Sequence, residues 1–476
     1  MFFERIYERG LAQASFLVGC QATGEAIVID PKRDIDDYLT LARREGLRIR
    51  KVTETHIHAD FLSGSRELAA ATGAELLLSD EGGREWQYEF PHTSLRHGDH
   101  FMVGNLKFEV LHTPGHTPEH VCFLLTDTPA GSDPVMIFTG DFVFVGDVGR
   151  PDLLEKAAGI AGTMEDGAQL LWRSLALFRD LPDHLQVWPG HGAGSACGKA
   201  LGAVPGSTVG YEKLVNWAFQ AKDEASFVAT ILDGQPEPPT YFATMKRLNK
   251  VERPLFEKKT LAILEPEELE AFMRKGAVLA DLRSKQAFLG GHIPGALFLP
   301  WSNAFTTWAG WVIPYDRPII LSCDARLADD AVIALSRIGL DQVAALAPDV
   351  DTWEQSGRRL ALVDSVDASD LARHAEHTGA MILDVRGTAE FAEARIAGSK
   401  RVHFGNLRKH MDELPKDRPL AVHCKAGNRS LLACSILQSE GYDEVINVSG
   451  GIDAWVKHGG AVEPGGDEPA RDRVSR

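Results

Sequence analysis

The sequence predicts a multidomain α/β protein. Apolar runs typical of β-strands, such as "GEAIVID" at 24–30 and "LKFEVLHT" at 106–113, alternate with helical segments at 61–72 and 167–181. The second half contains an internal repeat in which apolar strands again alternate with helices, a pattern typical of parallel sheets. A chain of 476 residues is too long for one hydrophobic core, and usual domain sizes suggest about three domains.

The composition argues against several classes of protein. The chain is 44% hydrophobic and 25% charged, and its net charge of −17 disfavours a nucleic-acid-binding surface, which needs clustered Lys and Arg. No apolar run approaches the roughly 18–20 residues of a membrane span, and "MFFERIYERG" carries charges where a signal peptide is apolar. Six cysteines are too sparse for a disulfide-stapled secreted protein. We therefore expect a cytoplasmic protein that binds neither nucleic acid nor membrane.

The internal repeat lies in the second half of the chain. The segment "LADLRSKQAFLGGHIPGALFLP" from Leu279 aligns with "ILDVRGTAEFAEARIAGSKRVHF" from Ile382. A short apolar strand follows each segment and ends in a cysteine, Cys323 or Cys424, and each copy then continues into a helical segment. Two copies of one strand–helix domain follow from this repeat. The predicted domains are residues 1–258, 259–364 and 365–463, with a polar, disordered tail at 464–476.

Candidate metal ligands lie on four separated segments of the first domain, each just after a strand-like run. Loops in this position can aim their side chains into a shared cleft. A single histidine more often has a surface or capping role, but these segments together, shaped by Gly and Pro, predict a metal site. The candidates are His56, His58, Asp60, His112, His116, Asp141 and His191.

These motifs resemble those of the metallo-β-lactamase fold over nearly all of residues 1–258. The resemblance implies an αββα sandwich, two sheets between helices, with the metal cleft at one edge. Members with two metals carry a histidine directly after the aspartate of the first motif, where this chain has Phe61. A phenyl ring donates no lone pair to a metal, so this residue disfavours a dinuclear hydrolase, although some members work with one zinc.

The departure at Phe61 resembles one branch of the fold, the persulfide dioxygenases, which oxidise the outer sulfur of a thiol persulfide. The resemblance implies one Fe(II) in this domain, held by His56, His116 and Asp141. Two histidines and one carboxylate suit non-haem Fe(II) and leave positions for substrate and O₂. Residues expected to orient these ligands or to hydrogen-bond to substrate are His58, Asp60 and His191. His112 is equally consistent with a structural role.

Two further candidates lie in the first domain. The resemblance implies that Arg150 faces the substrate and anchors an anionic group of the carrier thiol; the alternative is a salt bridge to Asp152 or Asp147. Members that act on glutathione persulfide carry Asp-Tyr after the last histidine, where this chain has "HGAGSACG". The carrier therefore stays open between glutathione, coenzyme A and similar thiols. Cys197, in this altered loop, is either a redox-active thiol or a packed structural cysteine.

The motif "VHCKAGNRS" predicts a sulfur-handling loop. A strand delivers Cys424 into a six-residue loop that ends at Arg429 and leads into a helix, whose N-terminus binds anions and lowers a thiol pKa. Lys425 and Arg429 add positive charge, and Gly427 lets the backbone N–H groups point inward. We expect Cys424 and Arg429 to be catalytic, with Lys425, Gly427 and Asn428 binding substrate.

The loop and its flanking segments resemble the rhodanese-like domain, whereas related phosphatases use a loop one residue longer. The first copy, around Cys323, has lost the loop glycine and carries three acidic residues that would repel an anion, Asp324, Asp329 and Asp330. We therefore expect this copy to be degenerate and structural.

Together the domains resemble a persulfide dioxygenase–sulfurtransferase fusion. The resemblance implies oxidation of a low-molecular-weight persulfide by O₂ to sulfite and thiol, with sulfur transfer through Cys424 between persulfide and sulfite or thiosulfate, in either direction. It further implies a role in sulfide detoxification and a homo-oligomer. One alternative is a zinc thioester hydrolase of the glyoxalase II kind fused to a sulfurtransferase. Another is a rhodanese pair that acts as a docking or sulfur-relay adaptor without turnover.

Overall fold

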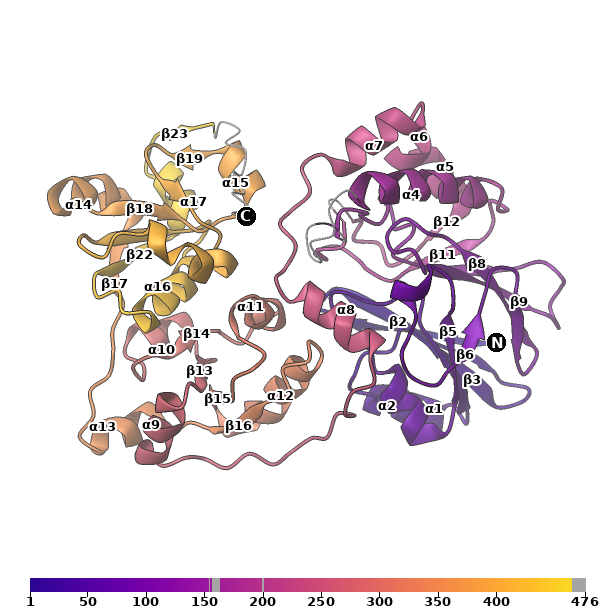
Figure 1. Cartoon of the computed structure of the whole chain (residues 1–476), viewed down its shortest axis with the longest axis horizontal. Helices are drawn as coiled ribbons and strands as arrows, with labels where there is room; N and C mark the ends of the chain where they lie inside the picture. Colours follow the sequence, from indigo (N-terminus) through magenta and orange to yellow (C-terminus); the bar gives the residue numbers. More distant parts are fainter. Residues whose placement is uncertain (154, 156–162, 199–200, 465–476) are drawn as a thin grey trace. The chain divides into compact units, whose positions relative to one another are not determined.

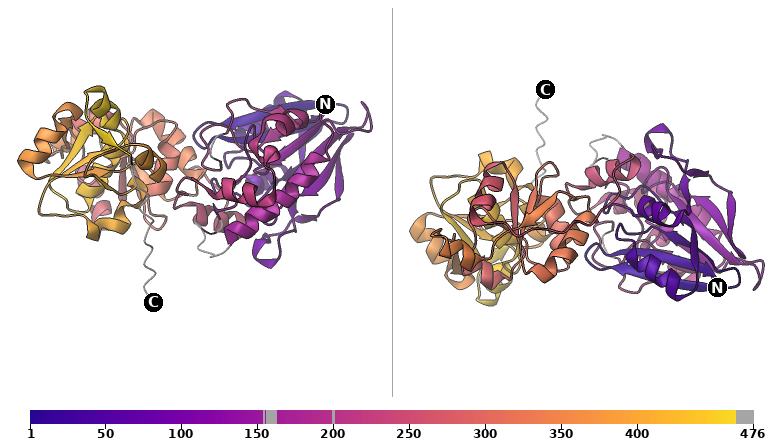
Figure 2. Two further views of the ribbon diagram at one scale, coloured as in Figure 1. Left: turned by 90° about the horizontal axis from the view of Figure 1, so that it is seen from above. Right: turned by 90° about the horizontal axis from the view of Figure 1, so that it is seen from below.

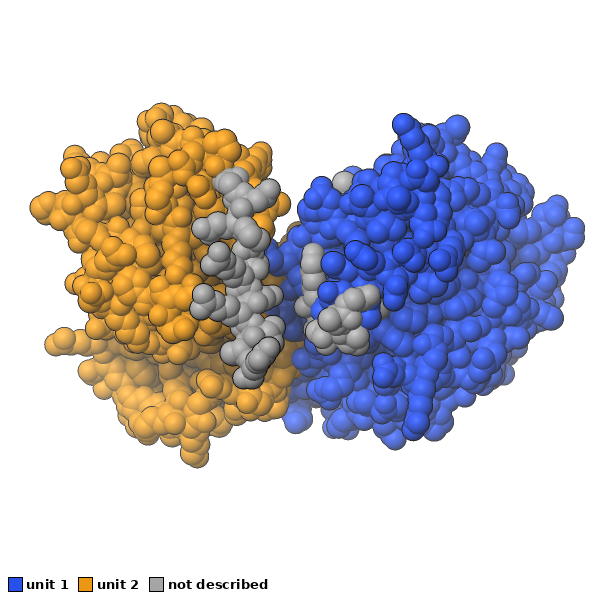
Figure 3. Space-filling view, turned by 45° about the horizontal axis from the view of Figure 1, so that its top comes forward, with its two compact units in different colours: residues 1–259, 330–341 blue, residues 260–329, 342–476 orange. Residues whose placement is uncertain are grey.

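A computed structural model describes residues 1–153, 155, 163–198 and 201–464 of the chain. It divides into two compact units, coloured separately in Figure 3. Unit 1 comprises Met1–Lys259 and Asp330–Asp341, and unit 2 comprises Thr260–Asp329 and Gln342–Arg476. The first division falls beside the boundary expected at 258, but a short segment of the first repeat copy clusters with unit 1. The expected disordered tail, from residue 465 on, lies outside the described residues.

Unit 1 contains two six-stranded sheets (Figure 1). The first sheet has the order β1 (Phe2–Glu8), β2 (Gln13–Cys20), β3 (Glu25–Ile29), β4 (Arg48–Thr53), β5 (Glu75–Ser79) and β6 (Thr93–Leu95). The second has the order β12 (Ser207–Thr208), β11 (Gln186–Pro189), β10 (Met136–Gly140), β9 (Val121–Asp127), β8 (Leu106–His112) and β7 (His100–Val103). The strands expected at 24–30 and 106–113 are confirmed as β3 and β8.

The inner faces of the two sheets form one apolar core. Alternation along β8 buries Leu106, Phe108 and Val110 on the inner face, as expected for a half-buried strand. Phe16 of β2 and Phe138 of β10 contact across the core, with ring centroids 5.0 Å apart. Burial of this apolar surface is the main force that holds the two sheets together.

Helices cover the outer faces and complete the sandwich (Figures 1 and 2). The first sheet packs against α1 (Asp36–Arg44) and α2 (Ser65–Thr72), and the second against α4 (Thr163–Arg179) and α7 (Glu224–Leu232). Helix α4 buries Ala168, Leu171, Leu175 and Phe178, whose spacing is that of one helical face. The expected αββα sandwich is confirmed. Unit 1 also contains η1 (Arg84–Trp86), α5 (Val209–Val215), α6 (Trp217–Gln220) and α8 (Phe242–Lys250).

Unit 2 contains two parallel sheets with the same strand order, which confirms the repeat. The first copy has the order β16 (Val343–Leu346), β15 (Ile319–Ser322), β13 (Val278–Asp281) and β14 (Leu297–Phe298). The second has β22 (Val445–Ser449), β21 (Leu420–His423), β18 (Met381–Asp384) and β20 (Lys400–Arg401), with β17 (Asp364–Asp367) added beside β22. A small antiparallel pair joins β19 (Arg395–Ile396) to β23 (Val462–Glu463).

Helices connect these strands, as parallel pairing requires. The first copy contains α9 (Pro266–Arg274), α10 (Lys285–Leu289), α11 (Phe305–Val312), η2 (Ala325–Leu327), α12 (Ala328–Ser336) and α13 (Val350–Gln355). The second contains η3 (Ala368–Asp370), α14 (Leu371–Thr378), α15 (Thr388–Glu393), η4 (Phe404–Glu413), α16 (Arg429–Ser439) and α17 (Gly451–Lys457). Among the helices described, none combines the length and apolarity that crossing a membrane would take.

The segment from Asp330 to Asp341 is held in unit 1 by charged contacts. Arg337 pairs with Asp34 at 2.7 Å and with Glu8 at 2.9 Å, and Asp341 pairs with the buried Arg33 at 2.6 Å. The backbone N–H of Leu62 also donates to the carbonyl of Arg337. The contacts of this segment therefore belong to the first unit even though its sequence belongs to the first repeat copy.

Candidate metal centre and thiol loop

The metal-site residues project from loops that follow four strands of unit 1. His56 follows β4, His116 follows β8, Asp141 follows β10 directly and His191 lies beyond β11. Gly140, the last residue of β10, has φ of 49° and turns the chain towards Asp141, and a Cβ at this position would collide with Thr55 and His120. The strand ends thus bring together side chains that are far apart in the sequence.

Three of the expected ligands form a compact, buried cluster. One ligand atom each from His56, His116 and Asp141 lies within 4.8 Å of the other two. Asp141 Oδ2 is 3.9 Å from His56 Nε2 and 3.5 Å from His116 Nε2. His56 Nε2 and Asp141 Oδ2 are buried without a hydrogen-bond partner, a condition that costs about 1–3 kcal/mol per group. A cation bound between these atoms would remove that cost, so the residues fit a metal.

A relay from Asp30 orients the ring of His56. Asp30 accepts hydrogen bonds from the backbone N–H and the hydroxyl of Thr55, at 2.7 and 2.9 Å. The hydroxyl proton is thereby used, so the Thr55 oxygen accepts the Nδ1–H of His56 at 3.0 Å. The Nε2 atom of His56 consequently carries a lone pair directed at the cluster. Asp30 was not expected from the sequence; its only signal is its place at the end of the apolar run "EAIVID".

The ring of His116 is fixed in the same way by a backbone carbonyl. His116 Nδ1–H donates to the carbonyl of Arg150 at 3.0 Å, which leaves Nε2 as the ligand atom. Burial lowers the pKa of both His56 and His116, so both rings are neutral and can donate a lone pair to a metal.

His191 joins two carboxylates. Its Nδ1–H donates to Asp141 Oδ1 and its Nε2–H donates to Asp60 Oδ2, both at 2.7 Å. Burial lowers the pKa of His191, but the carboxylates of Asp141 and Asp60 outweigh burial and raise this pKa well above its ordinary value. The imidazolium of His191 holds Asp141 so that only Oδ2 faces His56 and His116. Asp60 and His191 thus lie beside the cluster; their expected role of orienting the ligands stays a prediction.

His58 lies beside His56 but is engaged elsewhere. Its Nε2 is 3.1 Å from Asp30 Oδ1, and its ring centroid is 4.3 Å from that of Phe61. Burial lowers the pKa of His58, but Asp30 outweighs this and raises it. Phe61 is 1% exposed, so it fills the space beside His58 with an apolar ring.

One buried histidine near the cluster was missed by the sequence analysis. His120 Nε2 accepts the backbone N–H of Asp141 at 3.1 Å, and its ring centroid lies 5.1 Å from that of His56. Its Nδ1–H donates to Thr113 at 2.8 Å. His112, in contrast, bonds to the carbonyl of Pro118 and is only partly buried, which favours the structural alternative.

Arg150 has a different environment from the one expected. Its guanidinium is fully buried and forms a bidentate pair with Asp152, with both N–O distances 2.8 Å. It also donates to the carbonyls of Ala196 and Pro236. These contacts correspond to the salt-bridge alternative rather than to a free substrate anchor. Arg150 braces the loops around His116, whose Nδ1–H binds its carbonyl.

Cys197 lies close to Asp60 and His191. One ligand atom each from Asp60, His191 and Cys197 lies within 4.8 Å of the other two. Both nitrogens of His191 already donate to carboxylates, so this second group offers no free imidazole lone pair. Burial, together with Asp141 and Asp60, raises the pKa of Cys197 well above its ordinary value. The side chain is therefore a protonated thiol in this arrangement.

In unit 2, the thiol loop follows β21. Cys424 is 2% exposed, and the backbone N–H of Gly427 donates to its Sγ at 3.1 Å. Gly427 has φ of 94°, which favours glycine. The backbone N–H of Ile452 donates to the carbonyl of Cys424 at 2.9 Å, and the backbone N–H of Asp453 donates to the carbonyl of Lys425 at 3.1 Å. The first turn of α17 therefore fixes the backbone of the loop. Lys425 and Asn428 are exposed at its surface.

Arg429 is engaged by a carboxylate that the sequence analysis did not identify. Its Nη1 and Nη2 donate to the two oxygens of Glu390 at 2.6 and 2.7 Å. Burial raises the pKa of Glu390, but Arg429 outweighs burial and lowers it, so the carboxylate stays ionised. The expected catalytic arginine thus braces the loop against α15, and Glu390 compensates its charge.

The corresponding loop of the first copy has a different chemistry. Burial, followed by Asp324 and Asp281, raises the pKa of Cys323 to about 11. Asp324 pairs with Arg326 at 2.7 Å. A thiol that stays protonated beside acidic groups is a poor nucleophile. This environment agrees with the expectation that the first copy is degenerate.

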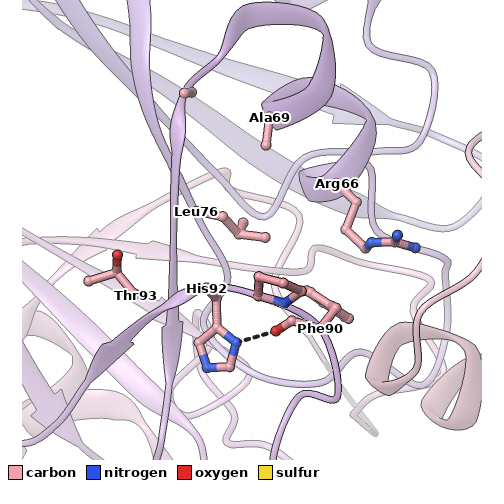
Figure 4. A pocket seen from close by; sticks show the side chains of 8 residues that line it. Arg66, Ala69, Leu76, Phe90, His92 and Thr93 are labelled. Carbon is pink, nitrogen blue, oxygen red and sulfur yellow. Dashed lines mark hydrogen bonds between the residues drawn. The ribbon is translucent and has the colours of Figure 1, made fainter.

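A surface pocket of about 500 Å³ lies elsewhere in unit 1, between α2, β5 and the start of β6 (Figure 4). Its lining includes Arg66, Leu76 and His92, and the His92 Nδ1–H donates to the carbonyl of Phe90 at 2.7 Å. None of the metal-cluster residues lines this pocket, and we assign it no function.

Comparison with known proteins supports two families. Residues 9–191 match the metallo-beta-lactamase superfamily, and residues 265–356 and 367–458 each match the rhodanese-like domain. A crystal structure of a metallo-beta-lactamase from Staphylococcus aureus is 44% identical, covers 73% of this chain and 98% of its own, and has a TM-score of 0.66.

Two curated relatives match separate parts of the chain. A hydroxyacylglutathione hydrolase of Polaromonas is 33% identical over 195 residues, which are 40% of this chain and 66% of the hydrolase. A sulfurtransferase of Allochromatium vinosum is 35% identical over 99 residues, which are 21% of this chain and 92% of the sulfurtransferase.

Proposed function

Because the chain belongs to the metallo-β-lactamase superfamily and carries two rhodanese-like domains, we propose that it oxidises thiol persulfides and transfers their sulfane sulfur. In the first reaction, RSSH, O₂ and H₂O give RSH and sulfurous acid, which ionises to sulfite. In the second, sulfane sulfur passes through Cys424 between a persulfide and sulfite, so that RSSH and sulfite give RSH and thiosulfate. The carrier thiol is a small thiol such as glutathione or coenzyme A.

The observation that carries the proposal is the donor set of the cluster. Two neutral imidazoles and one oxygen of Asp141 converge, and two of the three ligand atoms have no other partner. Two histidines and a carboxylate suit Fe(II) in non-haem oxygenases, where the metal supplies activation of O₂ and a coordination position for the substrate sulfur. Thr55 and the Arg150 carbonyl hold the ligand rings, and His191 holds Asp141.

The surroundings of the cluster favour one metal ion rather than two. Phe61 occupies the position at which dinuclear relatives carry a histidine and packs against His58. His191, a potential ligand of a second metal, donates both of its N–H groups to carboxylates. A second metal would have to displace those protons.

The Cys424 loop supports the sulfurtransfer step. The N–H of Gly427 points at the Cys424 Sγ, and α16 begins directly behind the loop with its unpaired N–H groups. These groups stabilise a thiolate, which attacks the outer sulfur of a donor and forms a Cys424 persulfide while the donor anion leaves. Attack by an acceptor on that persulfide then regenerates the thiolate.

A second candidate function is zinc-dependent thioester hydrolysis. The similarity to a hydroxyacylglutathione hydrolase favours it. Phe61 and the engaged His191 disfavour the dinuclear site that such hydrolysis typically uses.

Metal content and product analysis test the two functions. The protein is purified, its iron and zinc are measured, and O₂ uptake is followed with persulfides of glutathione and coenzyme A while sulfite and thiosulfate are quantified. Iron with O₂ uptake and sulfite formation supports persulfide oxidation. Zinc with cleavage of S-lactoylglutathione and no O₂ uptake would replace it with the hydrolase. The variant His56→Ala should abolish O₂ uptake, whereas retained uptake would contradict the assigned metal site.

A further inference from the structure

The positive charge of the Cys424 loop is smaller than its sequence implies. Arg429, one of its two cations, forms a bidentate pair with Glu390. Arg386, at the end of the neighbouring strand β18, is likewise paired with the buried Asp384 at 2.6 Å. Within the second copy, Lys425 is thus the loop's uncompensated cation. Thiosulfate and sulfite are dianions, so this single exposed ammonium leaves their charge poorly matched.

A further cation comes from the first rhodanese-like copy. Lys285 is the first residue of α10, and its Nζ lies 2.7 Å from the position that a Cβ on Gly427 would occupy. A Cα–Cβ bond is about 1.5 Å long, so the ammonium lies within about 4.2 Å of the Gly427 Cα. This places it at the residue whose N–H donates to the Cys424 Sγ.

The contact is part of the packing between the two copies within unit 2. The backbone N–H of Phe298 in the first copy donates to Ser435 Oγ of α16 at 3.0 Å, and both groups are buried. The side chain of Arg408 in the second copy donates to the carbonyl of Val312 in the first at 2.6 Å. The two copies are therefore joined by hydrogen bonds at two places, and the packing between them brings Lys285 to the loop.

Among the described residues, Lys285 has no carboxylate partner that explains its position. Over the residues that the structure describes, its ammonium forms neither an ion pair nor a hydrogen bond, although the side chain is half-buried. An ammonium without a carboxylate partner beside the thiol loop is available to a bound anion, with which it would form a charge-assisted hydrogen bond. A purely structural role for Lys285 would require a carboxylate partner, which the described part of unit 2 does not supply.

We propose that Lys285 completes the anion-binding site of Cys424, so that the first copy supplies a substrate-binding residue to the second. The inference rests on the proposed sulfurtransfer at Cys424. The ammonium of Lys285 binds the sulfonate oxygens of thiosulfate or sulfite, while Gly427 N–H faces the reacting sulfur. This contact gives the copy that lost its own thiol chemistry a direct part in the reaction of the other.

Steady-state sulfurtransfer from thiosulfate to cyanide by the full-length protein tests the inference. The variant Lys285→Met should raise KM for thiosulfate about tenfold and change kcat less than about threefold, because it removes a charged contact to the bound anion. Lys285→Arg should keep KM near the wild-type value. Lys275→Met, at an exposed lysine after α9 in the same copy, is the matched control and should have no effect. O₂ uptake should be unchanged in every variant.

Binding without turnover separates this inference from the proposed function. Sulfite binding is measured by calorimetry with Cys424→Ser and with the double variant Cys424→Ser/Lys285→Met, and thermal unfolding checks that both are folded. We expect the double variant to bind sulfite about tenfold more weakly. Equal binding by the two proteins, or an unchanged KM in Lys285→Met, would overturn the role of Lys285. A wild type without sulfurtransfer would overturn the proposed function, and the binding comparison would still decide about Lys285.

Discussion

Replacement of Phe61 by histidine tests whether this residue keeps the metal centre mononuclear. The phenyl ring is 1% exposed and lies 4.3 Å, centroid to centroid, from the ring of His58. Exchange of a buried phenyl group for a smaller, polar imidazole removes apolar burial worth about 2 kcal/mol. The free energy of unfolding of the metal-free variant should therefore fall by about 2 kcal/mol.

A second metal would restore this stability. The new histidine would join Asp60 as a ligand, and a metal present at about 100 times its Kd stabilises the folded state by about 2.7 kcal/mol. We therefore expect the iron-loaded variant to bind about two metal ions per chain and to regain its thermal stability. Persulfide oxidation should not increase, because His56, His116 and Asp141 are unchanged.

The assay combines anaerobic reconstitution with iron, metal analysis, thermal unfolding with and without metal, and O₂ uptake. Phe61→Leu is the control: it keeps the position apolar and should bind about one metal ion, like the wild type. Two metal ions in the wild type would refute the reasoning. So would a Phe61→His protein that binds one metal ion yet oxidises persulfide faster.

Three further predictions concern other parts of the chain. Asp30→Asn breaks the relay that orients His56 and should weaken iron binding about 10- to 100-fold, as measured by competition with a chelator. Cys424→Ser should reduce thiosulfate:cyanide transfer by about 1,000-fold and leave O₂ uptake unchanged; loss of O₂ uptake instead would reverse the assigned roles. Burial raises the pKa of Glu67, but Arg253 and Arg33 outweigh burial and lower this pKa below 4.5. The ionised Glu67 therefore stabilises the folded protein above pH 4.5, and this stabilisation is lost as the pH falls through the lowered pKa. Glu67→Gln leaves the buried Arg253 without its carboxylate partner and leaves Arg33 with Asp341 alone. The substitution should cost about 3–5 kcal/mol at neutral pH and should make the stability less dependent on pH in acid, as measured by urea unfolding; an unchanged pH dependence would contradict this.

The fold and the clustering of the candidate metal ligands were largely predictable because they follow local patterns. Alternation along β8 and the helical spacing of α4 appear directly in the residues. The histidines and Asp141 stand just after apolar runs, where strand ends meet at one edge of a sheet. The repeat around Cys323 and Cys424 likewise predicted two sheets of one strand order.

The residues that orient the site were not predictable because their roles depend on pairing across the fold. Glu390 is one of many acidic residues until α15 brings it to Arg429. Asp30 and His120 act through hydrogen bonds to residues 20 or more positions away, which no spacing in the sequence reveals. The same applies to Arg150: Asp152, two residues further on, indicated a possible salt bridge, but no pattern in the sequence showed the backbone contact of Arg150 to His116.

The boundary of unit 1 has a consequence for how this chain can be divided. A protein that ends at residue 259 would contain every candidate metal ligand but would lack Arg337 and Asp341, the partners of Asp34 and Arg33. Arg33 is fully buried, so exposure of its surroundings is expected to lower the stability of such a fragment. Unit 1 is thus built from two separate stretches of the chain, and a gene that ends after residue 259 does not encode the second of them.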